Sequence, residues 1–173
     1  MNAASAMTDL TRLAGTWKLD PQKTSITFQT RAMWILTVKG TAQALSGDAD
    51  ITPEGEAQGT LVIDAASFDT KNTKRDHHLR DADFFDAATH PTIVFEATSA
   101  RPGWAGLEVH GTLTIRGQAK PITLHAEISG SPDSATVATS IEIDRSLWGI
   151  TWGAKMGVAL RNQVTITAHF DRA

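Results

Sequence analysis

The densest group of ionisable side chains lies between residues 72 and 86. His77 and His78 are adjacent there and follow Asp76, and further carboxylates come soon after, at Asp81, Asp83 and Asp86. Imidazole and carboxylate groups are common metal ligands. Adjacent residues on a helix point about 100° apart, so two neighbouring histidines do not readily share one ion. We therefore predict no metal site, and interpret these side chains as helix caps, ion pairs or anchors.

The pair Arg75 and Asp76 in the same segment has two interpretations. It could take part in catalysis, or it could hold the segment in place. One guanidinium can donate hydrogen bonds to several loop carbonyls and to a carboxylate. We favour a structural clamp.

Other catalytic arrangements are absent from the sequence. There is no cysteine, which excludes disulfides, thiol nucleophiles and thiolate metal sites. There is also no Gly-x-Ser-x-Gly nucleophile motif and no glycine-rich phosphate loop. His110, His125 and His169 alternate with apolar neighbours and are predicted to face solvent. We predict that the protein is not an enzyme and needs no obligatory cofactor.

The elements that position these groups are mostly β-strands. Thr, Ile and Val are abundant, and seven segments alternate apolar and polar residues with period two. Shorter runs bring the expected total to about eight to ten strands. Turn residues separate them, so successive strands are predicted to pair as hairpins and to close into an antiparallel β-barrel. The residues expected to be buried inside it are Ile26, Phe28, Ile93, Phe95, Leu113, Ile115, Leu124, Ile141 and Ile166.

Residues 72–86 break the strand pattern. They are charged and poor in β-branched residues, which favours one short helical segment. Leu79, Phe84 and Phe85 would anchor it, and Pro91 forces an extended exit into the next strand. We expect this segment to lie across the mouth of the barrel.

Composition limits the partners and the location. The formal net charge is −3 and no basic stripe is present, so nucleic acid is a poor partner. No apolar run approaches the roughly twenty residues that span a bilayer. The first ten residues carry neither the cationic nor the apolar region of a secretory signal, which predicts a cytoplasmic protein. We expect a flexible tail over residues 1–12 and one domain over 13–173, and leave open whether the chain forms a homodimer.

Several motifs, in order, resemble the central signature of the YceI-like family. They lie at residues 64–70, 75–79, 83–86, 90–95, 111–117, 120–124 and 145–150. The resemblance covers residues 17–170. It implies a lipocalin-like antiparallel β-barrel whose apolar lumen binds a long isoprenoid chain, such as a polyprenyl or quinone tail. It implies no established catalytic residues.

Two positions depart from the family pattern. Residues 20–24 carry Lys23 where the family usually has a histidine, and Arg31 stands near the place of a second one. Both changes leave a permanently cationic donor in place of a group that can donate and accept. The polar end of a ligand is therefore expected to be held differently here.

Large apolar side chains gather where the strand pattern fails, in residues 32–36, 79–85 and 147–156. Loops at a barrel mouth are where apolar ligands are admitted. The chain has no tyrosine, so these rings carry no hydroxyl group, which agrees with a hydrocarbon ligand. The predicted ligand-binding residues are Trp34, Leu36, Leu79, Phe84, Phe85, Trp148, Trp152 and Met156, with Phe28 and Ile93 deeper inside.

The favoured function is binding, transport or storage of an amphipathic lipid, with a polyisoprenoid or quinone as the bound molecule. Two alternatives stay open. The first is a quinone-linked redox helper or enzyme, which would need polar groups converging at the mouth. The second is a ligand-free structural or partner-binding domain, which a barrel filled by its own side chains would favour.

Overall fold

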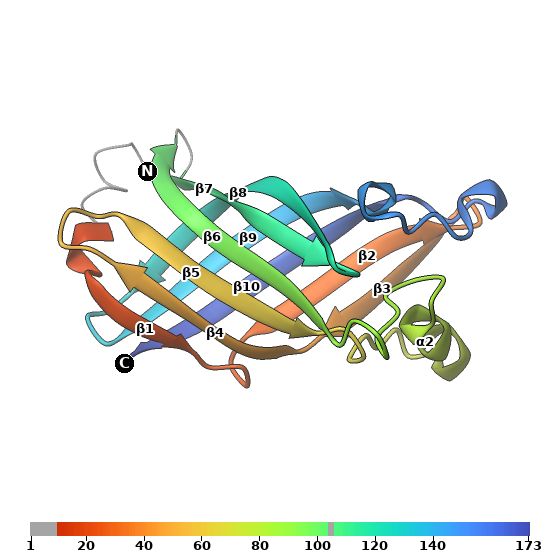
Figure 1. Ribbon diagram of the computed structural model, residues 1–173, viewed down its shortest axis with the longest axis horizontal. Coiled ribbons are helices and arrows are strands. Elements are labelled where there is room, and N and C mark those ends of the chain that lie inside the picture. The colour runs from red at the N-terminus through yellow and green to blue at the C-terminus, as the bar shows by residue number, and fades with distance from the viewer. Residues whose placement is uncertain (1–9, 104–105) are drawn as a thin grey trace.

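The computed structural model describes residues 10–103 and 106–173. Within them, ten antiparallel strands form an elongated barrel (Figure 1). The strands are β1 (Gly15–Leu19), β2 (Ser25–Ala32), β3 (Leu36–Ala42), β4 (Ala44–Ile51), β5 (Ala57–Asp64), β6 (Thr92–Gly103), β7 (Gly106–Ile115), β8 (Gln118–Gly130), β9 (Ser134–Asp144) and β10 (Arg161–Arg172). Residues 10–12 are helical, and the other helical elements are α2 (Thr73–Arg80) and the 3₁₀ turns η1 (Arg145–Trp148) and η2 (Ala154–Met156).

Eight of these strands form a closed ring in the order β1-β4-β5-β6-β7-β8-β9-β10. The ring closes because β1 pairs with both β4 and β10. Strand β10 is long enough to pair first with β2, over residues 163–167, and then with β1, over residues 170–172. The β2–β3 hairpin thus extends the wall, and a bridge between Thr41 and Asp69 ties it to the segment before α2. The predicted lipocalin-like antiparallel barrel is confirmed.

The inward faces match the period-two pattern. All nine residues predicted to share the interior line one cavity. Ile26, Ile93, Leu113 and Ile115 are buried. None of the nine is exposed, and the other five are half-buried: Phe28, Phe95, Leu124, Ile141 and Ile166. Their side chains border open space inside the barrel, so part of their surface stays accessible.

One end of the barrel is closed by the segment before β1, and we call it the sealed end. Leu10 packs against residues of β4, β5, β7 and β8, while Leu13 and Trp17 pack against β4, β8, β9 and β10. The Trp17 indole Nε1 donates to the Leu13 carbonyl at 2.8 Å, and the Arg172 guanidinium lies 4.4 Å from its ring centroid. Apolar side chains therefore bridge opposite walls of the barrel here.

The sealed end changes the expected boundary of the domain. Leu10 is only 2% exposed, so packing begins inside the range expected to be a flexible tail, residues 1–12. Leu10 packs against distant strands, and the composition of the residues around it does not predict such contacts. The rest of that expectation, and the missing export signal, concern residues 1–9, which lie outside the described part of the chain.

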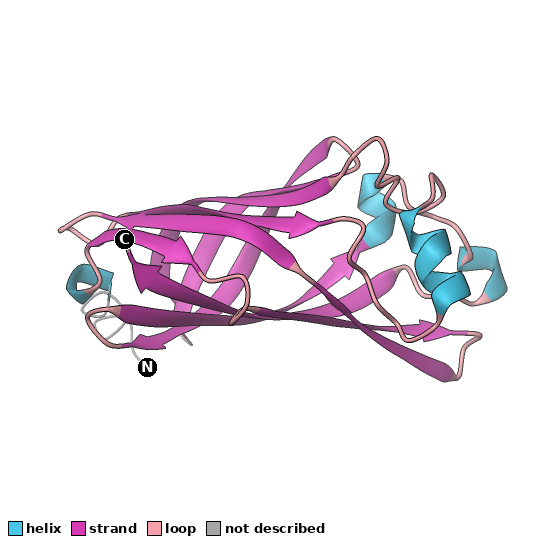
Figure 2. Cartoon of the chain, turned by 90° about the horizontal axis from the view of Figure 1, so that it is seen from below, coloured by secondary structure: helices cyan, strands magenta, loops and turns pink. Residues whose placement is uncertain are grey.

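At the opposite end, α2, η1, η2 and the β2–β3 hairpin gather around the barrel opening (Figures 1 and 2). We call this the loop end and define it as residues 31–39, 70–90 and 145–160. The predicted helical segment is confirmed over Thr73–Arg80 and continues as turns. The Asn72 side chain caps α2 by accepting from the Arg75 N–H at 3.0 Å. The only buried residue of α2 is Asp76, so polar contacts dominate its attachment.

Candidate functional site

The barrel encloses a cavity of about 870 Å³ that runs from the sealed end to the loop end. This volume lies toward the upper end of ligand-binding cavities, which span about 300–1,000 Å³. Its walls are mainly aliphatic and aromatic side chains from the strands of the ring and from β2 and β3. Toward the sealed end it meets Leu10, Leu13 and Trp17, and toward the loop end it meets α2 and the loop after η1. The lumen thus suits a long apolar ligand.

Two clusters of rings mark the loop end of the cavity. In the first, His78 of α2 contacts Phe84 and Trp152 edge-on, with ring centroids 5.1 and 4.4 Å apart, and Phe84 lies 5.5 Å from Trp152. Offset and edge-to-face arrangements are the favourable ones for such rings. This cluster joins α2, the turns after it and the loop between η1 and η2. It forms an aromatic rim at the mouth.

The second cluster lies on the wall beside the mouth. Phe68 stacks on Phe85 at 4.3 Å and meets Phe28 edge-on at 5.5 Å. Gly40 stands opposite Phe28 in the β2–β3 register, and a Cβ at Gly40 would lie 2.6 Å from the Phe28 ring. The missing side chain at position 40 therefore makes room for this ring. Phe28 and Phe85 thus both contact Phe68.

Arg145 holds the loop after η1 in place. It is buried, and its guanidinium donates to three backbone carbonyls, those of Ile150, Val158 and Ala159, at 2.9, 3.2 and 3.1 Å. It also lies 5.6 Å from the Phe84 ring centroid. Burial lowers the pKa of Arg145, and the nearby Asp144 carboxylate opposes that shift. The sequence predicted no role for Arg145, although residues 145–150 form one of the motifs that resemble the family.

Asp144 begins this turn. Its carboxylate accepts from the Ser146 hydroxyl at 2.6 Å and from the Ser146 N–H at 3.0 Å. These two donors lower the pKa of Asp144 by stabilising its charged form. The segment that carries Trp148 and Trp152 is therefore capped at its start and tied down by Arg145 along its length.

Arg75 and Asp76 meet at Thr70, the residue that precedes the turn into α2. The Asp76 carboxylate accepts from the Thr70 N–H at 2.8 Å and from its hydroxyl at 2.5 Å. Arg75 donates to the Thr70 hydroxyl at 2.7 Å and to its carbonyl at 2.9 Å. Both side chains thus bind the backbone that leads into the helix, in the geometry of a clamp.

Most of the charged side chains at the cavity lie toward the loop end, while Asp48, Gln58 and Thr60 line it on β4 and β5. The polar lining residues on or next to the helical segments are Asn72, Lys74, Arg75, His77, His78, Asp81 and Arg145. On β2, the Thr30 hydroxyl is buried, lines the cavity and has no hydrogen-bond partner within the described part of the chain. A buried hydroxyl without a partner costs free energy until something bonds to it. The cavity is therefore amphipathic, with polar groups near its mouth.

Six of the ten predicted ligand-binding residues line the cavity together: Phe28, Leu79, Phe84, Phe85, Ile93 and Trp152. Four do not, and the reasons differ. Trp148 is 1% exposed and donates from its indole Nε1 to the Leu113 carbonyl at 3.1 Å, so it packs in the wall. Trp34, Leu36 and Met156 project into solvent beyond the mouth.

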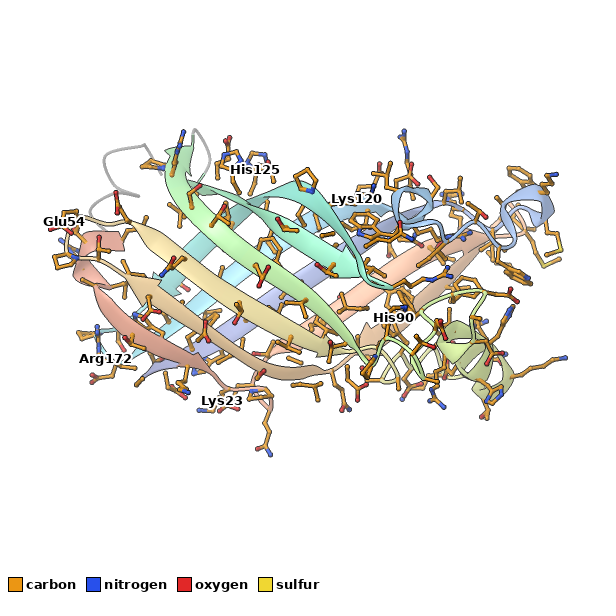
Figure 3. The ribbon with its side chains drawn as sticks, viewed as in Figure 1. Lys23, Glu54, His90, Lys120, His125 and Arg172 are labelled. Carbon is orange, nitrogen blue, oxygen red and sulfur yellow. The ribbon has the colours of Figure 1, made fainter. Side chains whose placement is uncertain are left out.

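The family departures and the strand histidines lie away from the cavity. Lys23 pairs with Asp20 at 3.4 Å on an exposed turn, and Arg31 is exposed on β2. Neither side chain is among the residues that line the lumen. His110 and His169 pair with Glu108 and Asp171 at 2.7 and 3.2 Å. Figure 3 shows Lys23 and His125 on the outside of the barrel.

Within the described residues, no group of three or more His, Asp or Glu side chains is arranged to hold a metal ion. None of the helices in residues 10–103 and 106–173 is long and apolar enough to cross a membrane.

Several proteins of known sequence or structure are similar to this chain. A UPF0312 protein of Vibrio cholerae is 36% identical over 110 residues, which cover 62% of this chain and 58% of that protein. The chain thus spans less than two thirds of that relative. Burkholderia cenocepacia BcnA has the same fold, with a TM-score of 0.76 and 22% identity over 87% of this chain and 98% of that one. A polyisoprenoid binding domain from Saccharophagus degradans also shares it, with a TM-score of 0.68 and 18% identity over 91% and 98% of the two chains.

The comparison with family models covers most of the chain. The YceI-like domain model matches residues 17–171, which contain every strand of the ring except the start of β1 and the last residue of β10. The same range includes both aromatic clusters and the Arg145 and Arg75 contacts. By that match, this chain belongs to the YceI-like domain family.

Proposed function

We propose that this protein binds a long amphipathic lipid of the isoprenoid class in its lumen and stores or transports it. The observation that carries the proposal is the apolar cavity of about 870 Å³, closed at one end and rimmed by rings at the other. The fold neighbour from Saccharophagus degradans, described as a polyisoprenoid binding domain, supports the same ligand class. A ligand-free structural role is less well supported, because a barrel with that role would be filled by its own side chains.

The energetics fit a chain of modest length. Burial of one CH₂ is worth about 0.8 kcal/mol, so one five-carbon unit contributes about 4 kcal/mol. Micromolar binding needs about −8 kcal/mol. Association itself costs about 4–15 kcal/mol, so roughly three to six units are enough. Affinity then comes from hydrocarbon burial, and the polar groups near the mouth orient the ligand.

The geometry favours one orientation of the ligand. The hydrocarbon chain would run toward Leu107, Val109 and Ile128, which line the lumen on the side of the sealed end. Its polar end would stay near Thr30 and the polar side chains of α2. Phe84, Phe85, Leu79 and Trp152 would contact the units closest to the mouth. A polyprenyl alcohol and a quinone would both satisfy this arrangement.

Titration of the delipidated protein with isoprenoids of increasing length tests the proposal. We expect saturable one-to-one binding that tightens with chain length and perturbs tryptophan fluorescence. Trp152→Ala should weaken binding, whereas Leu45→Ala, an exposed leucine outside the lumen, should not. If no chain binds with a dissociation constant below about 0.1 mM, roughly −5 to −6 kcal/mol, the proposal fails.

The same titration separates a carrier from a quinone-linked redox role. A carrier should bind a polyprenyl alcohol and a quinone of equal chain length with similar affinity. A redox protein should prefer the quinone, and binding should shift the reduction potential of the bound quinone.

The cytoplasmic location also stays a prediction. Fractionation of a native host tests it, and recovery in an extracytoplasmic fraction would contradict it.

A further inference from the structure

Exposed apolar side chains are concentrated at the loop end. Eight large hydrophobic residues are exposed within the described part of the chain, and Leu45 is the only one of them away from this end. The other seven are Met33, Trp34, Ile35, Leu36, Leu147, Trp152 and Met156. We call these seven residues the apolar tip. Single exposed apolar residues are ordinary, but a contiguous group marks an interaction site.

The segments that carry the apolar tip are in contact. The Ala159 N–H donates to the Arg31 carbonyl at 2.8 Å, and the Trp34 N–H donates to the Gly157 carbonyl at 3.4 Å. Gly157 lies directly under the Trp34 indole, where a Cβ would come within 2.7 Å of Nε1. Arg145 then connects the loop after η1 to the same region through its three carbonyl contacts. The hairpin and the segment of Met156 are therefore held side by side by backbone hydrogen bonds.

The hairpin holds its apolar residues outward at a conformational cost. Met33 and Trp34 both have positive φ angles, 51° and 68°. Turns with such angles usually contain Gly, Asn or Asp, because larger side chains are disfavoured there. Ile35 follows and is 82% exposed. A simple hairpin turn would favour small or polar residues with positive φ, and it would not expose large apolar side chains. The sequence of this turn therefore indicates that its side chains contact another molecule.

The charges around the apolar tip have one sign on the hairpin side. Residues 21–47 and 145–160 contain no Asp or Glu. Arg31, Lys39 and Lys155 are exposed cations in those stretches. The nearest carboxylates are Asp81 and Asp83 on the α2 side of the mouth, which accompany Arg80 and Lys74, and Asp144, which caps η1 and lies next to Arg145. Anionic lipid headgroups attract exposed basic side chains near the membrane surface.

A second copy of the chain fits this surface poorly. Symmetric dimers use the same patch on both subunits, so each patch must complement itself. Pairing through the apolar tip would bring Arg31, Lys39 and Lys155 close to the same cations of the other copy. Like charges placed against each other oppose association. A bilayer with anionic lipid presents the opposite charge together with an apolar interior.

We infer that the apolar tip docks on the surface of a bilayer that contains anionic lipid. Trp34, Ile35 and Met156 insert between headgroups, and the cations of the hairpin side contact the phosphates. The aromatic rim of the cavity then faces the membrane directly. Docking depends on the outer surface alone, so it holds whichever ligand the lumen accepts.

Flotation with vesicles tests the inference. The probes are phosphatidylcholine vesicles with and without phosphatidylglycerol. We expect wild-type protein to bind the anionic vesicles and to show a blue shift of tryptophan emission. Trp34→Ser with Ile35→Ser should lower the partition coefficient by about tenfold or more, since each change removes a large apolar side chain from the interface. Leu45→Ser removes a leucine that is 49% exposed on β4 and should change nothing.

Further variants and a measurement of oligomeric state complete this test. Ile35→Ser alone alters a side chain with almost no packing, so it keeps the test valid if the double variant unfolds. Lys39→Glu with Lys155→Glu should weaken binding to anionic vesicles and leave the weak binding to neutral ones unchanged. Equal partitioning of wild type and the double variant would overturn the inference, as would failure of wild type to bind anionic vesicles. A dimer in sedimentation velocity that the same variants dissociate would assign the apolar tip to a second copy.

Discussion

The two ends of the barrel use the same residue types in opposite ways. At the sealed end, Leu10, Leu13 and Trp17 are buried against facing strands, and the Trp17 indole N–H is bonded inside the fold. At the loop end, Trp34 and Met156 stand in solvent, and the segments are fixed by guanidinium contacts to backbone carbonyls. Packing thus dominates the sealed end, whereas the loop end combines these polar contacts with a packed base that includes Trp148 and Ile150, each 1% exposed. The loop end can therefore present apolar side chains to a lipid without loosening the barrel.

The largest expected effect is at the sealed end. Trp17→Ala should lower the free energy of unfolding by about 3–5 kcal/mol, because it removes a fully buried ring and leaves a cavity. Trp152→Ala, at the partly exposed rim, should cost about 1 kcal/mol or less. Denaturant unfolding of the two variants gives the comparison. Equal losses would show that the two ends do not differ in how they are stabilised.

The next effect tests the polar support of the loop end. Arg145→Ala should cost about 2–4 kcal/mol, since three carbonyls lose their donor in a largely buried site. Arg145→Lys should recover little, because one ammonium cannot reproduce the planar fork of donors. Arg161→Ala is a matched control: its exposed side chain makes an ion pair of 3.6 Å with Glu142, and its loss should be nearly neutral. A neutral Arg145→Ala would contradict the account of this end.

The α2 clamp should have a smaller effect. Arg75→Ala should lower stability by roughly 1–3 kcal/mol, because the Thr70 carbonyl and hydroxyl lose a charged donor. Lipid bound per folded molecule should change less than stability does. Lys74→Ala, one residue earlier and exposed, serves as the stability control. If Arg75→Ala matched wild type in thermal unfolding, the clamp would be an unimportant surface contact.

The strand pattern was sufficient to predict the barrel, but the loop end needed the structure. Alternation of apolar residues is local, so the inward faces of β2, β6, β7 and β10 follow directly from the sequence. Trp148 and Trp152 lie four residues apart in one irregular segment, yet only Trp152 lines the cavity. That difference depends on long-range bonds, from Trp148 to Leu113 and from Arg145 to Val158. Residue type and spacing do not encode such bonds.

The smallest expected effect is at the start of η1. Asp144→Ala should cost about 1 kcal/mol at neutral pH by removing a side-chain cap. Because the folded state lowers the pKa of Asp144, the carboxylate stabilises the fold above its ordinary pKa of 3.8, and this contribution is lost as the pH falls through the lower folded value. The difference between wild type and Asp144→Ala should therefore shrink in acid. Asp144→Asn keeps an acceptor that does not titrate, so its stability relative to Asp144→Ala should not shrink in the same way.

Blocking the lumen tests the central claim most directly. Ala97 lines the cavity with a small side chain, so a larger side chain at this position would extend into the lumen. Ala97→Trp should fold normally and lose isoprenoid binding in native mass spectrometry. Glu96→Trp, which adds the same ring on the exposed face of β6, should bind like wild type. Undiminished binding by a folded Ala97→Trp variant would contradict the claim that the lumen holds the ligand.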